Sequence, residues 1–178
     1  MGHGVVHLKD LGYTPAQAAF SLSVMLFSAL LGNLLVAALG DHIDPRLIWA
    51  AASFVFGVGM LVALRASGPL GLWVYAILLG LGFGACFPCV MTLPANYFGH
   101  KAYASIVGIL MVTGTVIGAT GSFSAGFVYD HFGSYARVFY AVALLCFFSS
   151  LVLLFLRPPV LKGERSLVAA AATGPVYE

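Results

Sequence analysis

The sequence predicts an all-α membrane protein with five transmembrane helices. Five long runs contain no Asp, Glu, Lys or Arg, and all such residues between Leu11 and Leu156 lie in the short gaps between these runs. A helix needs roughly 20 apolar residues to cross a bilayer, and each run has about that length or more. The chain is 61% hydrophobic and 8% charged, whereas a soluble domain has about 25% charged residues. In lipid a backbone must satisfy its own hydrogen bonds, so the runs should be helical.

The first expected span covers residues 15–39. It starts at residues 14–17, Thr-Pro-Ala-Gln, a capping box with proline at the first helical position. The second expected span, residues 47–63, follows a short charged loop that contains Pro45 and ends before Arg65. The loops on both sides of this span carry charges that do not belong in hydrocarbon.

Three further spans are expected, over residues 70–91, 104–128 and 138–156. Ser-Gly-Pro at 67–69 precedes the first of them, Gly-His-Lys at 99–101 separates the first two, and a short polar loop separates the last two. Two consecutive prolines end the last helix, because proline cannot continue it. Residues 158–178 are expected to form a mobile cytoplasmic tail.

Lysine and arginine in short loops predict the orientation, since they favour the cytoplasmic side. With five spans, one side would hold Arg46, Lys101, Arg157, Lys162 and Arg165, and the other Lys9, Arg65 and Arg137. We therefore expect a multi-pass protein of the cell (inner) membrane with a cytoplasmic C-terminus. Residues 5–8 resemble the end of a helix, and the span count is odd. Both features favour a truncated chain.

Composition and residue placement exclude several classes of function. The scattered Lys and Arg form no basic stripe for nucleic acid. None of the five histidines lies in an expected span, and no pair has metal-ligand spacing. The spans lack Asp, Glu and His, so a buried nucleophile and base are missing. We expect no catalytic residue, no metal and no cofactor, and hence no enzyme. Cys86 and Cys89 have redox-motif spacing, but their mid-span position favours simple packing.

Small residues recur every four positions on two spans. Gly114, Gly118, Ser122 and Gly126 share a face of the fourth span, and Gly80 and Gly84 share a face of the third. Such stripes let helix backbones approach closely in lipid. They can serve packing alone, or they can also let the helices slide during transport. Among the uncharged polar residues within the spans, Asn33 is the hardest to satisfy in hydrocarbon. It should face a neighbouring helix or a wet cavity.

Four short segments resemble loop motifs of one membrane-protein family, the major facilitator superfamily. Residues 39–46, Leu-Gly-Asp-His-Ile-Asp-Pro-Arg, resemble a degraded form of its Gly-x-Leu-small-Asp-Arg-x-Gly-x-Arg loop signature. Residues 126–135 are similar to the Gly-x-x-x-Asp-x-x-Gly-Ser-Tyr segment of monocarboxylate-transporter-like and oxalate/formate-antiporter-like members. Residues 97–101 and 11–15 fit two further loops of these members. The resemblance covers the chain from about residue 5 to residue 157.

The resemblance implies that the five spans are helices eight to twelve of a twelve-helix carrier, most of its C-terminal six-helix bundle. Such carriers place two bundles around a central site and work by alternating access. It also implies that Asp41 and Arg46 form a cytoplasmic latch between bundles, the alternative being a solvated loop that sets topology. Asp130 belongs to a second gating loop. The substrate-facing candidates that follow from the resemblance are Asn33, Phe87, Thr113 and Thr115.

The leading hypothesis is secondary active transport of a small organic solute, a monocarboxylate or related organic anion, coupled to a proton or counter-substrate. Oxalate-type relatives carry a basic residue in helices eight and eleven, whereas the corresponding spans 15–39 and 104–128 contain none. Dicarboxylates are therefore disfavoured. The expected partners are the lipid bilayer, a missing N-terminal helical bundle and the solute. The alternative is a non-transporting membrane subunit or remnant that packs against another membrane protein.

Overall fold

The computed structural model describes residues 12–40, 42–65, 68–99 and 102–156, and these form five helices. The helices are α2 (Pro15–Leu39), α3 (Pro45–Leu64), α4 (Gly68–Phe98), α5 (Tyr103–Phe132) and α6 (Ala136–Phe155). Each is long and apolar enough to cross a membrane, and no strand occurs in the described ranges. The prediction of an all-α fold with five long apolar helices is confirmed.

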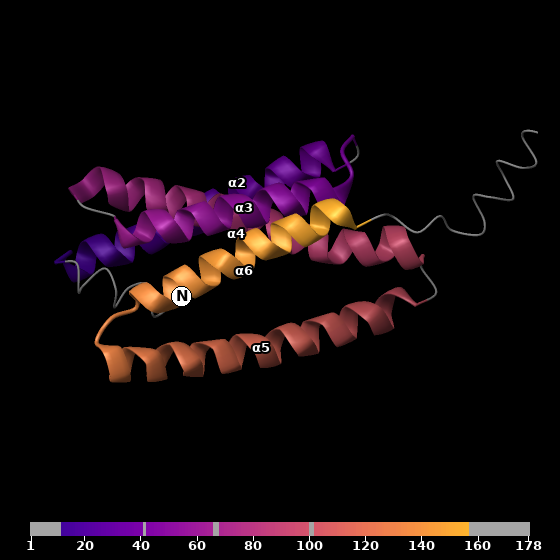
Figure 1. Ribbon diagram of the computed structural model, residues 1–178. Helices are drawn as coiled ribbons and strands as arrows, with labels where there is room; N and C mark the ends of the chain where they lie inside the picture. Colours follow the sequence, from indigo (N-terminus) through magenta and orange to yellow (C-terminus); the bar gives the residue numbers. More distant parts are fainter. Residues whose placement is uncertain (1–11, 41, 66–67, 100–101, 157–178) are drawn as a thin grey trace, which may run out of the picture.

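Four of the helices form a packed group, and the fifth lies apart. α4 packs along α2 and α3, and α6 packs along α3. α5 runs along one side of this group and touches α4 and α6 only sparsely (Figure 1). Because short loops join consecutive helices, neighbours in sequence run antiparallel. We call the two ends of the group the Arg46 end, where α3 begins, and the Arg65 end, where α3 stops.

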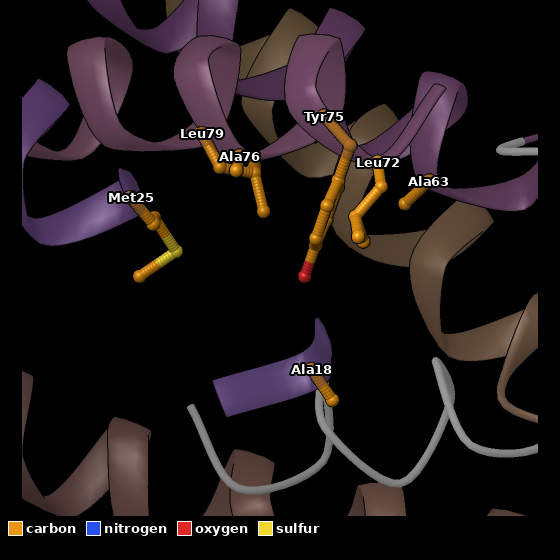
Figure 2. Close-up of a cluster of buried hydrophobic side chains, with 7 residues drawn as sticks. All are labelled: Ala18, Met25, Ala63, Leu72, Tyr75, Ala76 and Leu79. Carbon is orange, nitrogen blue, oxygen red and sulfur yellow. The ribbon is translucent and has the colours of Figure 1, made fainter. Parts of the chain in front are cut away.

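A cluster of buried hydrophobic side chains lies toward the Arg65 end and joins α2, α3 and α4. Figure 2 shows its seven side chains, which are Ala18, Met25, Ala63, Leu72, Tyr75, Ala76 and Leu79. Alanine recurs in this cluster because small side chains let helices approach closely in lipid. Large apolar side chains instead cover the outside of the helices, as expected where lipid is the solvent.

α2 and α4 approach each other closely at two glycines of α4. A Cβ added at Gly84 would overlap the backbone carbonyl of Ala29, and a Cβ added at Gly80 would overlap that of Met25. The two backbones are therefore in direct contact at both glycines. On α5 the geometry is the opposite, since a Cβ at Gly114, Gly118 or Gly126 would have no described atom within 4 Å. Ser122 of the same stripe is exposed.

Polar groups fix the ends and the contacts of several helices. The predicted capping box of α2 is confirmed, since the Gln17 N–H donates to Thr14 Oγ1 over 3.3 Å and the Thr14 N–H donates to Gln17 Oε1 over 3.0 Å. The buried Ser150 hydroxyl of α6 donates to the Ala50 carbonyl of α3 over 2.8 Å. This hydrogen bond links two spans that are distant in sequence.

Helix boundaries differ from the expected spans mainly in α4 and α5. α4 continues to Phe98 and passes through Pro88 and Pro94, whereas we expected it to stop near residue 91. Each proline removes one backbone donor, which a long packed helix can tolerate. α5 continues to Phe132 and ends at Gly133, whose φ of 64° is a left-handed conformation that suits glycine. The expected tail at 158–178 lies outside the described residues.

Candidate functional site

An uncharged hollow of about 260 Å³ lies between α2, α3 and α4, toward the Arg46 end. α2 contributes Asn33 and one face of its last two turns, α3 contributes Pro45, and α4 contributes Pro88 and Thr92. The lining therefore combines apolar surface with one amide and one hydroxyl. We refer to it as the Asn33 hollow.

The polar groups of the Asn33 hollow are anchored to their own helices. Asn33 Nδ2 donates to the Ala29 carbonyl over 3.1 Å, and the Thr92 hydroxyl donates to the Pro88 carbonyl over 2.9 Å. These bonds use one amide hydrogen of Asn33 and the single hydroxyl hydrogen of Thr92. The second amide hydrogen of Asn33 can donate to a bound carboxylate, and Asn33 Oδ1 and the lone pairs of Thr92 can accept from a donor of the bound molecule.

Pro88 interrupts the α4 hydrogen-bond ladder beside this hollow. Proline has no N–H, so the Gly84 carbonyl, four residues earlier, lacks its usual intrahelical donor. Irregular backbone at membrane depth is tolerated where it is packed against protein or lines a water-filled cavity. In α4 the interruption coincides with an amide- and hydroxyl-lined hollow, which is the kind of place where a membrane protein can bind a solute.

The four predicted substrate-facing residues lie at two separate places. Asn33 lines the hollow, and Phe87 precedes Pro88 with 57% of its surface exposed. Thr113 and Thr115 are exposed on α5, and the Thr115 hydroxyl donates to the Met111 carbonyl of its own helix over 2.8 Å. No α5 residue lines the hollow, so the structure does not bring the threonines to it.

Arg46 ties together two helix ends beside the hollow. Its Nε lies 2.9 Å from Asp44 Oδ2, and its Nη1 donates to the carbonyl of Leu156, the C-cap of α6. The buried Tyr97 hydroxyl of α4 has no hydrogen-bond partner in the part of the chain that the structure describes. Asp41, the predicted latch partner, lies outside the described residues.

Asp44 has a double role at this end. Its carboxylate caps α3 by accepting the Arg46 N–H over 3.0 Å, and it pairs with the Arg46 side chain. Asp130 is exposed at the opposite, Arg65 end. Of the predicted gating residues, Arg46 and Asp130 thus lie at opposite ends of the helix group. The ion pair of Asp44 and Arg46 lies at the start of α3.

The thiols of the predicted spans are packed between helices. Cys86 Sγ lies 3.9 Å from the Ser53 hydroxyl of α3, and Cys89 is buried. Within the described ranges, no three His, Cys, Asp or Glu side chains gather in a way that could hold a metal ion. The lining of the Asn33 hollow likewise offers no set of ligating side chains.

Sequence reasoning missed Asp44, Thr92 and Ser150 as interaction partners. Asp44 was detectable, because Asp followed by Pro is a strong signal for the start of a helix. Thr92 lies four residues after Pro88, which is the spacing at which a hydroxyl reaches a carbonyl one turn earlier. Nothing in the sequence pairs Ser150 with Ala50, because that contact depends on which helices become neighbours.

These features define a polytopic α-helical membrane protein with a hydrogen-bonding hollow inside its helix group. The family model described as the Major Facilitator Superfamily matches residues 5–175, and the chain belongs to this superfamily. The resemblance inferred from the loop motifs is confirmed.

Similar proteins of known name are transporters. The chain is 29% identical over 139 residues to monocarboxylate transporter 13 of Bos taurus. The matched residues cover 77% of this chain and 33% of that protein. It is 30% identical over 149 residues to the multi-drug resistance efflux pump PmrA of Streptococcus pneumoniae serotype 4, covering 82% of this chain and 37% of that protein. It is 23% identical over 129 residues to the niacin transporter NiaP of Acinetobacter baylyi, and this match covers 71% of this chain and 29% of that protein. The chain spans about a third of the length of these relatives.

Proposed function

We propose that the protein is part of a secondary active transporter that moves a small organic solute by alternating access. The observation that carries the proposal is the Asn33 hollow, which lies where Pro88 interrupts α4 in a chain of the Major Facilitator Superfamily. Secondary transporters place their substrate sites at interrupted helices within the membrane. The spans contain hydrogen-bonding groups but no paired nucleophile and base, so transport is favoured over catalysis.

The solute class that we favour is a monocarboxylate or a related organic anion. Several relatives are named monocarboxylate transporters, which supports this class. The described arginines, Arg46, Arg65 and Arg137, all lie at helix ends. The described spans therefore provide uncharged hydrogen-bonding groups only. Each carboxylate held there without a cation adds a desolvation cost, which favours a solute with one carboxylate over a solute with two.

Within this proposal the predicted residues keep distinct roles. Asn33 faces the solute in the hollow. Phe87, Thr113 and Thr115 are exposed and do not line the hollow, and we propose that they face the central cavity between this bundle and the N-terminal one. Arg46, with Asp41 and Asp130, belongs to the loops that gate the two sides. The remaining partners are the lipid bilayer and an N-terminal helical bundle. The membrane is the cell membrane, with the C-terminus in the cytoplasm.

Uptake into proteoliposomes tests the proposal. The protein, expressed from its full reading frame, is reconstituted and assayed with labelled monocarboxylates, dicarboxylates and neutral solutes. We expect saturable uptake of a monocarboxylate that Asn33→Ala lowers by about tenfold, the scale of one lost hydrogen bond to a charged group. Asn96→Ala is the matched control, because Asn96 is an exposed amide of α4 outside the hollow. Absence of uptake across the panel, or equal loss in both variants, would contradict the proposal.

A further inference from the structure

A second hollow, distant from the Asn33 hollow, lies at the Arg65 end between α3, α4 and α6. Its volume is about 360 Å³. Val58 and Leu61 form part of its apolar wall, Gly71 of α4 lies at its side, and Arg65 and Tyr140 provide its polar groups. We refer to it as the Arg65 hollow. Nothing in the proposed transport cycle uses it.

The Arg65 hollow has a polar end and an apolar end. Arg65 is the C-cap residue of α3 and therefore lies where the helix leaves the hydrocarbon. Val58 lies seven residues earlier on the same helix, or roughly 10 Å deeper at 1.5 Å per residue. Tyr140, which is 51% exposed, adds an amphipathic ring of the kind enriched at membrane interfaces. A ligand that fits this hollow has a polar head and an apolar chain.

The charge at the polar end is positive and uncompensated in the described structure. The one ion pair found among the described residues is that of Asp44 and Arg46, at the opposite end. Asp130 also lies at the Arg65 end, but it belongs to α5 and does not line the hollow. An arginine at a membrane interface keeps its guanidinium at headgroup level, where a phosphate oxygen can accept charge-assisted hydrogen bonds.

We propose that the Arg65 hollow binds an anionic phospholipid from the surrounding bilayer. The phosphate accepts hydrogen bonds from Arg65 and Tyr140, and one acyl chain lies along Val58 and Leu61. A lipid is favoured over a soluble phosphate compound because the apolar side chains of α3 form a wall at membrane depth, and a soluble anion would leave that wall uncovered. The site is distinct from the Asn33 hollow in position and in ligand class.

Lipid titration followed by native mass spectrometry tests this proposal on the protein expressed from its full reading frame. Phosphatidylglycerol and phosphatidylcholine with identical acyl chains are compared, and Arg65→Gln is compared with Arg137→Gln. Arg137 is the matched control, because it is an arginine at the same end whose guanidinium lies 3.8 Å above the Phe132 ring and outside the hollow. Arg65→Lys keeps the charge and serves as the conservative variant.

We expect wild type to bind phosphatidylglycerol about tenfold more tightly than phosphatidylcholine, because both phosphates can accept from Arg65 but the choline cation of phosphatidylcholine repels the guanidinium. Arg65→Gln should abolish this preference, while Arg137→Gln keeps it and Arg65→Lys keeps part of it. Leu61→Trp, which fills the apolar end, should weaken both lipids. Equal binding of the two lipids, equal effects of the two Arg→Gln variants, or full displacement by glycerol phosphate would overturn the proposal. Lipid binding is measured without a transport assay. The lipid-binding proposal and the transport proposal can therefore fail independently of each other.

Discussion

Replacing Gly84 by alanine tests whether the contact between α2 and α4 stabilises the helix group. An added Cβ would overlap the Ala29 carbonyl and would lie 2.7 Å from Ala29 Cα. Carbon atoms in contact are normally about 3.5–4.0 Å apart, so the two backbones must separate locally by about 1 Å. Because the obstacle is backbone and not a flexible side chain, no rotamer change can relieve it.

The expected loss of stability follows from this overlap. Overpacking costs typically about 1–3 kcal/mol, and a rigid backbone obstacle places Gly84→Ala near the middle of that range or above it. In the opposite direction, alanine stabilises a helix by about 1 kcal/mol relative to glycine. Gly114→Ala on α5 has the same gain without an obstacle, since no described atom lies within 4 Å of its added Cβ. The difference between the variants should therefore be about 2 kcal/mol, a factor of roughly 30 in the ratio of folded to unfolded protein.

Equilibrium unfolding in detergent micelles measures this difference. Wild type, Gly84→Ala and Gly114→Ala are purified in the same detergent, and their free energies of unfolding are compared. Gly84→Ala should be the least stable of the three, and Gly114→Ala should match or exceed wild type. Equal stabilities of the two variants would refute the packing argument. A larger loss in Gly114→Ala would show that α5, not α4, carries the tight helix contact.

Two further substitutions test polar contacts between helices. Ser150→Ala removes the hydrogen bond to the Ala50 carbonyl and should lower the free energy of unfolding by about 1 kcal/mol. The control Ser149→Ala, one residue earlier, should lower it by less. Equal losses in the two variants would argue against the hydrogen bond. Arg46→Gln removes the guanidinium that donates to the Leu156 carbonyl at the end of α6. It should lower the free energy of unfolding by about 1–2 kcal/mol. An unchanged melting temperature would contradict this role of Arg46.

The fold was predictable because one physical requirement dominates it. Residues that cross hydrocarbon must be uncharged and helical, so the positions of Asp44, Arg65 and Arg137 between apolar runs indicate where spans begin and end. The end of α4 was less predictable, because Pro94 signals a stop by local rules. Leu93, Pro94 and Tyr97 are nevertheless buried, and the stretch stays helical as far as Phe98.

The candidate site was predictable only in part, because it depends on which helices become neighbours. Asn33 stood out as a costly amide in hydrocarbon, and it does line a hollow. Thr113 and Thr115 were candidates because the family resemblance implies substrate-facing positions on the fourth span, yet they lie on α5, away from that hollow. Spacing along one helix cannot show which face meets a neighbour from another part of the chain.

The contact of Arg46 illustrates the same limit. From the loop motif we predicted that Arg46 pairs with Asp41, which lies outside the described residues. Among the described residues Arg46 pairs with Asp44, two residues away, and with the end of α6, 110 residues away in sequence; the pairing with Asp41 stays a prediction. The first partner follows from helix capping, whereas the second requires α3 and α6 to be neighbours.

Cysteine accessibility tests the central claim that the helices cross the membrane in alternation. His42, at the Arg46 end, and Ser134, at the Arg65 end, are exposed and are separated by three helices. Each is replaced by cysteine in a variant without native cysteines, and sealed vesicles are treated with a membrane-impermeant maleimide. The account predicts that one position reacts in intact vesicles and the other only after permeabilisation. Reaction of both positions from the same side of intact vesicles would contradict it.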